Sequence, residues 1–311
     1  MPKLRSRGTL RLDAAPAPRM PRFVSAASGL VHVGELRYLV VDDLHDLAVF
    51  PNGTRRAGSL VRLFPGTVPS RKKARKKVKR DLESLVRLPA FDGFPHGALL
   101  ALGSGSLPRR RAGALAALDG QGRVSAGGVK RIDLADLYRA LGDEVGEVNI
   151  EGAFVEDSHL SLLQRANVGQ PRNARIRLRL QTTLEALSRE RSLTSKALVD
   201  VIDYILPGID GFPLGFTDGA ALAGGGFAFT AVAEDTDDAY ADGSCVGSAI
   251  GIVDGRDVVR ELWRLRPALK VEGIAVVQDD KGTTLEVVTD ADDPKVPARL
   301  LSVSLQRERK T

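Results

Sequence analysis

The sequence is poor in cysteine and in long apolar runs. Its single cysteine, Cys245, cannot form an internal disulfide bond, and the cysteine content does not imply secretion. No stretch approaches the roughly 18 apolar residues of a membrane-spanning helix, and the basic start MPKLRSRGTL lacks the apolar segment of a signal peptide. We therefore expect a cytoplasmic protein without a membrane partner.

Aromatic residues are also few, at 5% of the chain, whereas glycine is abundant, with 32 residues. The apolar fraction of 43% and the charged fraction of 27% are typical of soluble globular proteins. At 311 residues the chain has room for two ordinary domains or for one array of repeats. The presence of internal repeats favours the array.

A short unit recurs along the chain and is clearest at Lys270–Leu305, where three β-prone runs follow one another. Its opening can be matched at five places, namely Ala27–Val31, Leu82–Val86, Ile150–Phe154, Pro213–Thr217 and Val271–Ala275. After a turn, each opening is followed by an apolar run: Tyr38–Val41, Ala98–Leu102, Leu160–Leu163, Phe227–Val232 and Leu285–Val288. The units begin near residues 28, 83, 151, 214 and 272, which is a spacing of about 55 to 70 residues.

Such a repeat is typical of propeller blades, because a lone four-stranded sheet cannot bury both of its faces. We predict an all-β protein in which residues 1–311 form a single β-propeller domain of five blades, with six as the alternative number. The frequent glycines fit blades that pack closely around an axis. A large β-sandwich is the alternative fold, and the even spacing argues against it.

The last unit offers only three strands before the chain ends. We expect Thr9–Leu12 to supply the fourth by pairing with Arg299–Leu305, because closure by the termini removes an exposed sheet edge. Leu134–Leu141 has helical spacing and predicts a short helix. Leu184–Ser188 and Leu198–Leu206 are compatible with either helix or strand.

Positive charge is concentrated in Arg71–Arg80 (RKKARKKVKR), which carries eight cationic residues in a chain of net charge +6. Such a run can bind nucleic acid or another anionic surface through its charges. No aromatic residue is interleaved to stack on bases, so nucleic-acid binding is not favoured. We interpret the run as a solvated, mobile loop that is dispensable for folding.

Two sets of loops should converge at one mouth of the central channel, those that enter the innermost strands and those that follow the second strands. The first set places three carboxylates there: Glu83, Glu151 and Glu272. The second set adds Asp42, Asp43, Ser104, Arg165, Asn167, Glu234, Asp235, Asp290 and Asp292. Carboxylates around a narrow axis suit a hard cation such as Ca²⁺, which could polarise a phosphoryl or carbonyl oxygen. The three Glu residues are therefore candidate metal ligands. The alternative is that each Glu caps backbone amides of the neighbouring blade, which its recurrence in three blades favours.

The candidate substrate-binding residues are Ser104, Arg165, Asn167 and Asp290. Ser104 belongs to Gly103-Ser104-Gly105-Ser106, a turn that could cradle an anion with its amides, although a tight turn explains it equally. The sequence lacks a P-loop and a G-x-S-x-G elbow. The four histidines show no zinc spacing, and only His45 and His159 fall near the predicted mouth. No catalytic residue is identified.

The chain resembles the esterase-like phytase domains of bacterial propellers, and also uncharacterised propellers near the calcium-dependent phosphotriesterases and lactonases. The resemblance lies in Asp81–Leu85, Gly103–Ser106, Ile150–Gly152, Val271–Ala275 and Val288–Asp290. It implies a propeller fold, with calcium as a possible cofactor held by a channel Glu and by Asn and Asp ligands. Glu151, Asn167 and Asp290 are their counterparts by position.

Two functions remain open at this point. The first is a cation-assisted hydrolase of a phosphoester or lactone, with Ser104 and Arg165 holding an anionic group. The second is a propeller without catalytic activity that binds a small ligand or a protein at the same mouth. Salt-bridged Glu residues in the channel would favour the second.

Overall fold

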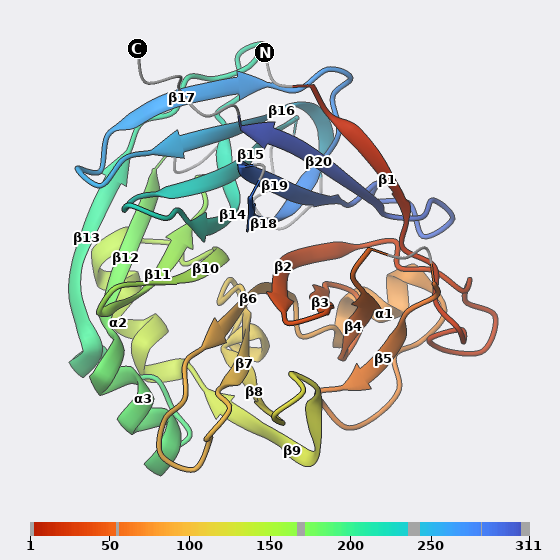
Figure 1. The fold of residues 1–311 in the computed structure, drawn as a ribbon, viewed down its shortest axis with the longest axis vertical. Helices are drawn as coiled ribbons and strands as arrows, with labels where there is room; N and C mark the ends of the chain where they lie inside the picture. The colour runs from red at the N-terminus through yellow and green to blue at the C-terminus, as the bar shows by residue number, and fades with distance from the viewer. Residues whose placement is uncertain (1–2, 54–55, 167–171, 236–242, 281, 306–311) are drawn as a thin grey trace.

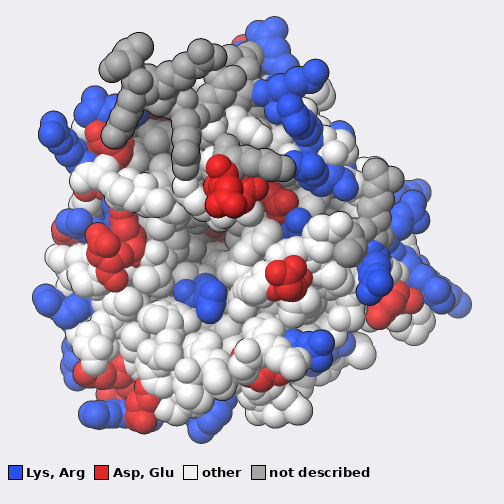
Figure 2. All heavy atoms as spheres, in the orientation of Figure 1, with Lys and Arg blue, Asp and Glu red and all other residues white. Residues whose placement is uncertain are grey.

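The computed structural model describes residues 3–53, 56–166, 172–235, 243–280 and 282–305. Within them the chain forms five four-stranded antiparallel sheets arranged as blades around one axis (Figure 1). The prediction of a five-bladed β-propeller is therefore confirmed. The surface is hollowed at the centre of the ring on the face seen in Figure 2.

The strands of each blade follow one another in the chain. The first blade holds β2 (Ala27–Val33), β3 (Leu36–Val41), β4 (Asp46–Pro51) and β5 (Ser59–Arg62). The second holds β6 (Leu82–Leu88), β7 (Ala98–Gly103), β8 (Ala112–Leu118) and β9 (Val124–Asp133). The third holds β10 (Ile150–Glu156), β11 (His159–Gln164), β12 (Asn173–Arg179) and β13 (Leu198–Tyr204). The fourth holds β14 (Gly215–Ala221), β15 (Phe227–Asp235), β16 (Ser244–Val253) and β17 (Val259–Arg264).

The fifth blade joins both ends of the chain. It consists of β18 (Val271–Asp279), β19 (Gly282–Thr289), β20 (Arg299–Leu305) and the N-terminal β1 (Arg5–Thr9). β1 pairs antiparallel with β20, with Thr9 opposite Arg299. The predicted closure is thus confirmed, but Thr9–Leu12 was the wrong segment. Leu10 and Leu12 are instead buried in the core that the first and fifth blades share. Burial of their apolar side chains there is more favourable than exposure at a sheet edge.

Each innermost strand carries a β-bulge close to its start. The register shifts at Ser28/Leu30, Leu82/Ser84, Ile150/Gly152, Phe216/Asp218 and Val271/Gly273. The bulge of the fourth blade therefore lies at Thr217, so the match of the fourth unit at Leu214-Gly215 was wrong by three residues. The fourth blade has Thr217-Asp218 where the third and fifth blades have Glu-Gly, so the sequence does not reveal the position of this bulge.

Glycine lets neighbouring blades approach at these bulges. Gly29 has φ +50°, and a Cβ atom there would lie 2.7 Å from the backbone nitrogen of Leu85 in the next blade. A Cβ atom at Gly273 would lie 3.1 Å from the nitrogen of Gly29. A Cβ atom would clash at Gly29 and would force the neighbouring strand to shift at Gly273. The blades consequently meet backbone to backbone near the axis.

The described residues include three α-helices, α1 (Lys72–Val78), α2 (Ala135–Val145) and α3 (Leu180–Arg189). They also include two short 3-10 helices, Pro108–Arg110 and Ser195–Ala197. α2 confirms the predicted helix, while the two ambiguous segments belong to α3 and β13. The apolar faces of α2 and α3 pack into the core shared by the second and third blades. In the described parts of the chain, none of the helices combines the length and apolarity that a membrane crossing requires. A cytoplasmic location stays a prediction.

Candidate functional site

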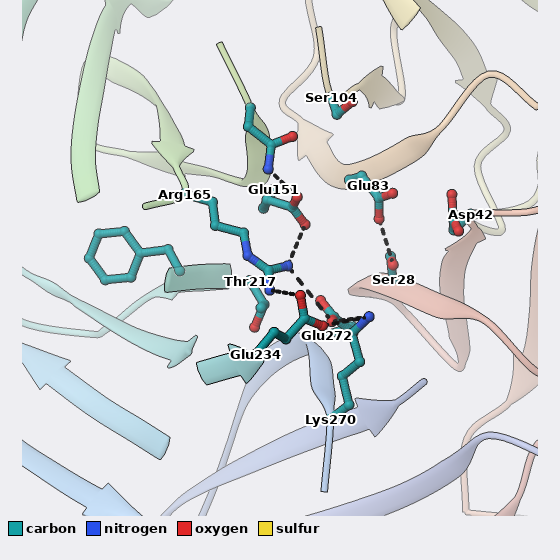
Figure 3. Close-up of polar contacts among 12 residues, drawn as sticks. Ser28, Asp42, Glu83, Ser104, Glu151, Arg165, Thr217, Glu234, Lys270 and Glu272 are labelled. Atoms are coloured by element: carbon teal, nitrogen blue, oxygen red, sulfur yellow. Dashed lines mark hydrogen bonds and ion pairs between the residues drawn. The ribbon is translucent and has the colours of Figure 1, made fainter. Parts of the chain in front are cut away.

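The bulges bring one residue from each blade to the same end of the axis. These residues are Ser28, Glu83, Glu151, Thr217 and Glu272, and Figure 3 shows them gathered around the axis. The three predicted Glu residues are therefore brought together. Two hydroxyls complete the ring: Ser28 donates to Glu83 Oε2 at 2.9 Å, and Thr217 donates to the carbonyl of Val271 at 2.7 Å.

Arg165 reaches into this ring from the end of β11. Its Nη2 lies 2.9 Å from Glu234 Oε2, and its Nη1 lies 3.6 Å from Glu151 and 4.0 Å from Glu272 (Figure 3). Only 12% of the Arg165 side chain is exposed. Burial by itself would lower the pKa of Arg165, but Glu234 and Glu151 raise it above its usual value. Arg165 is thus a fixed cation that joins the third blade to the fourth and fifth.

Lys270 is the second cation of the ring. Its Nζ lies 2.9 Å from Glu234 Oε1, 3.6 Å from Glu272 Oε1 and 3.0 Å from Asp292 Oδ2. Burial opposes the charge, but Glu272 and Glu234 raise the pKa of Lys270 well above its usual value. Glu234 consequently bridges Lys270 and Arg165.

The acidic members of the ring have raised pKa values. Burial is the main cause for Glu83, Glu151 and Glu272, and repulsion by neighbouring carboxylates adds to it. Arg165 and Lys270 lower the pKa of Glu272, but burial outweighs them. Glu272 is only 3% exposed, yet neither of its carboxylate oxygens has a hydrogen-bond partner within the described residues.

A third cation, Lys79, lies on the other side of Glu83. Its Nζ is 2.6 Å from both oxygens of Asp42 and 2.7 Å from Asp81 Oδ1. Carboxylate oxygens of Asp42, Asp81 and Glu83 all lie within 4.8 Å of one another. Burial would lower the pKa of Lys79, but the three carboxylates raise it above its usual value. The acidic group is thus paired with an ammonium of the same chain.

The basic run is part of this site, which corrects its interpretation as a mobile, solvated loop. Residues Lys72–Val78 form α1, and Arg75 is 2% exposed. Arg75 donates to Asp43 at 2.7 Å and to the carbonyls of Pro69 and Ser70. The run is held in place by ion pairs of its buried cations. Arg75 pairs with Asp43, and Lys79 pairs with Asp42 and Asp81. None of these three aspartates belongs to the basic run itself.

Ser104 and Asp290, two of the predicted substrate-binding residues, are both buried. Ser104 is 1% exposed, and its hydroxyl donates to Asp81 at 2.6 Å. The amides of Ser104 and Gly105 donate to the carbonyls of Asp81 and Arg110, so these two amides are occupied within the turn. Asp290 is 7% exposed, and burial raises its pKa to about 8 against the opposing effect of Lys270. Asn167 lies outside the described residues.

A pocket of about 690 Å³ opens beside Lys270 and Asp290. Its wall contains four cationic residues and two acidic ones: Lys72, Lys76, Lys270, Arg299, Asp290 and Asp292. Thr289, Ser244 and Cys245 also line it. Burial raises the pKa of the Cys245 thiol to about 11, which keeps it protonated and poorly nucleophilic. The charged side chains of the pocket wall, next to the buried ring, are therefore mostly cationic.

The sequence analysis missed Lys79, Asp81 and Lys270. A usable signal exists, because the residue two positions before each Glu is polar. Asp81 precedes Glu83, and Asn149 precedes Glu151, to which it donates at 2.7 Å. Lys270 precedes Glu272 in the same way. In each of the three blades this residue lies beside the Glu at the same mouth.

Comparison with known proteins identifies the family. A model for a family of unknown function (DUF6929) matches residues 23–305. This chain belongs to that family. No curated protein matches its sequence. The match supports neither an esterase-like phytase nor a calcium-dependent phosphotriesterase, so that finer resemblance is not confirmed.

Solved structures similar to this family member include a luciferin-regenerating enzyme, with 9% identity and a TM-score of 0.46 over 99% of this chain and 96% of that chain. Another is an exo-β-1,3-galactanase from Clostridium thermocellum, with 11% identity and a TM-score of 0.47 over 97% of this chain and 63% of that chain. At such identities the likeness concerns the fold and carries no argument about activity.

Proposed function

We propose that this propeller binds a small anionic ligand in the pocket beside Lys270. The observation that carries the proposal is the pocket wall, in which Lys72, Lys76, Lys270 and Arg299 face a volume of about 690 Å³. Small-molecule sites are concave and commonly measure about 300 to 1,000 Å³. Cationic side chains that converge on such a volume favour an anion.

The neighbouring carboxylates cancel only part of this charge. Asp292, the second acidic residue of the wall, pairs with Lys270 at 3.0 Å. Burial raises the pKa of Asp290 to about 8, so this carboxyl is largely neutral at pH 7. Lys270 is held in its charged form by Glu272 and Glu234. An anion in the pocket would therefore meet more positive than negative charge. Ligand affinity should fall above pH 8, because Asp290 then becomes negative.

The helix α1 contributes two of the pocket lysines. Lys72 and Lys76 are four residues apart and so lie on the same face of the helix. Arg75, which lies between them in the sequence, anchors the helix to Asp43. Lys72 also donates to the carbonyl of Asp292, which lines the same pocket. The basic run thus combines anchoring residues with ligand-facing ones.

Binding of inorganic phosphate and 4-nitrophenyl phosphate, measured by calorimetry with 4-nitrobenzyl alcohol as the neutral analogue, tests the proposal. We expect both anions to bind and the alcohol not to. Lys76→Ala should weaken binding at least about tenfold, in line with the loss of one charge-assisted contact. Lys73→Ala is the matched control, because Lys73 is exposed on the same helix and does not line the pocket. Equal effects of the two substitutions, or no binding of either anion, would contradict the proposal.

Hydrolysis of a phosphoester or lactone is the second candidate. Glu272 favours it, since its buried carboxylate has a raised pKa and accepts no hydrogen bond from the described residues. A carboxylate with these properties can accept the proton of an attacking water. Release of 4-nitrophenol from 4-nitrophenyl phosphate, and its loss in Glu272→Gln at unchanged melting temperature, would support this activity.

Calcium remains a prediction for this hydrolase. The donor set does not suit it well, because Glu83, Glu151 and Glu272 already lie among Lys79, Arg165 and Lys270. We therefore assign no step of the hydrolysis to a metal ion.

A further inference from the structure

The segment that follows α1 delivers a cation into an acidic cage. Lys79 is 6% exposed, and its ammonium contacts Asp42 and Asp81 at 2.6 and 2.7 Å. The oxygens of Asp42, Asp81 and Glu83 converge within 4.8 Å, as they would around a divalent ion. The centre of this group is thus next to a cation that belongs to the chain itself.

Lys79 is not a mobile surface lysine that happens to touch these acids. The preceding helix is anchored by buried Arg75, and the amide of Lys79 donates to the carbonyl of Arg75 at 2.9 Å. On its other side, Asp81 also accepts from Arg110 at 2.7 Å and from Ser104 at 2.6 Å. Further contacts therefore fix the backbone of Lys79 and one carboxylate of the cage.

The same arrangement occurs across the axis. Lys270 and Arg165 lie among Glu151, Glu234 and Glu272, at 2.9 to 4.0 Å. Both halves of the mouth accordingly contain cationic side chains where clustered carboxylates would otherwise repel one another.

We propose that Lys79 takes the place of a divalent cation in the Asp42–Asp81–Glu83 cage, so that the native mouth excludes Ca²⁺. A metal ion that entered the cage would meet the ammonium at short range in a buried setting, where charges repel more strongly than in water. Removal of the ammonium would leave three convergent carboxylates without their cation and so create a site for Ca²⁺.

Calcium titration of the full chain tests this inference. In Lys79→Met the aliphatic stem is kept and the charge is lost. We expect calorimetry to show Ca²⁺ binding to this variant at least tenfold tighter than to the native protein, and Ca²⁺ to raise its melting temperature by mass action. Lys77→Met, at an exposed position of the same segment, should behave as the native protein does. Adding Asp42→Asn to Lys79→Met should remove the new site.

Two results would overturn the inference. One is a folded Lys79→Met variant that binds no Ca²⁺. The other is Ca²⁺ binding by the native protein that Asp42→Asn abolishes, which can be measured even if Lys79→Met does not fold. A Lys79→Met chain that folds only when Ca²⁺ is present would support the inference. Anion binding in the pocket is measured separately, so its failure leaves this test intact.

Discussion

Asp218 Oδ2 accepts the backbone N–H of Ile274 at 2.9 Å, which ties the innermost strand of the fourth blade to that of the fifth. The same oxygen lies 3.4 Å from the N–H of Leu30 in the first blade, and Oδ1 accepts from Gly219 at 2.8 Å. Burial raises the pKa of this carboxyl well above its usual value, although these N–H groups oppose the rise. Asp218 thus has the capping role considered above for the repeated Glu residues.

Asp218→Ala should strongly destabilise the propeller. It would leave buried N–H groups of three blades without their acceptor, and each such group costs about 1 to 3 kcal/mol. We expect the free energy of unfolding, measured by urea denaturation, to fall by at least about 3 kcal/mol. Asp280→Ala is the control, because Asp280 is exposed. Similar urea midpoints for both variants would disprove the role of Asp218.

Closure of the ring by β1 can be tested by truncation. Deleting residues 1–9 removes the strand that pairs with β20 and exposes an edge of the fifth blade. The melting temperature should drop clearly, whereas deletion of residues 1–3, which precede the strand, should leave it unchanged. If both truncations melt at the native temperature, β1 does not contribute to stability.

The anchoring of α1 predicts unequal effects within the basic run. Arg75→Ala would leave Asp43 without its buried partner, and breaking a buried ion pair typically costs about 3 to 5 kcal/mol. Lys73→Ala, at an exposed position, should change the free energy of unfolding by no more than about 0.5 kcal/mol. Chemical denaturation of both variants is the measurement. Equal, small effects would restore the interpretation as a dispensable loop.

Glu286 predicts a specific acid sensitivity. It joins the fifth blade to the first, accepting from Arg37 Nε at 2.7 Å and lying 2.9 Å from His32 Nε2. Burial would raise the pKa of Glu286, but the bonds to His32 and Arg37 lower it to about 2. Because the folded pKa lies below that of the unfolded chain, this carboxylate stabilises the protein above pH 4.5, and its contribution disappears as the pH falls towards 2.

Glu286→Gln should therefore be less stable than the native protein at pH 7, and the difference should shrink between pH 4.5 and 2. Urea midpoints at pH 7, 4 and 2.5 measure this. Glu35→Gln, at an exposed position, serves as control. A difference that stays constant with pH would show that the loss arises from packing and not from the charge of Glu286.

The sequence by itself determined the propeller and its number of blades. Each blade is a local unit, in which alternating side chains and short turns specify antiparallel strands between neighbours in the chain. The recurrence of Glu83, Glu151 and Glu272 at equivalent positions also sufficed to place them at one mouth, since equivalent positions of a ring meet around its axis.

Only the tertiary structure decided how these carboxylates are neutralised. The sequence placed Arg165 at the mouth, and Lys270 stands two residues before Glu272, but Lys79 follows neither pattern. Nothing local shows which carboxylates each of these cations meets. β1 was placed wrongly for a related reason: its side chains are mostly exposed, so Arg5–Thr9 lacks the apolar pattern that marked Leu10 and Leu12. The ion pairs of the mouth and the pairing of β1 with β20 join residues that are far apart in the sequence. These residues come into contact only when the ring closes.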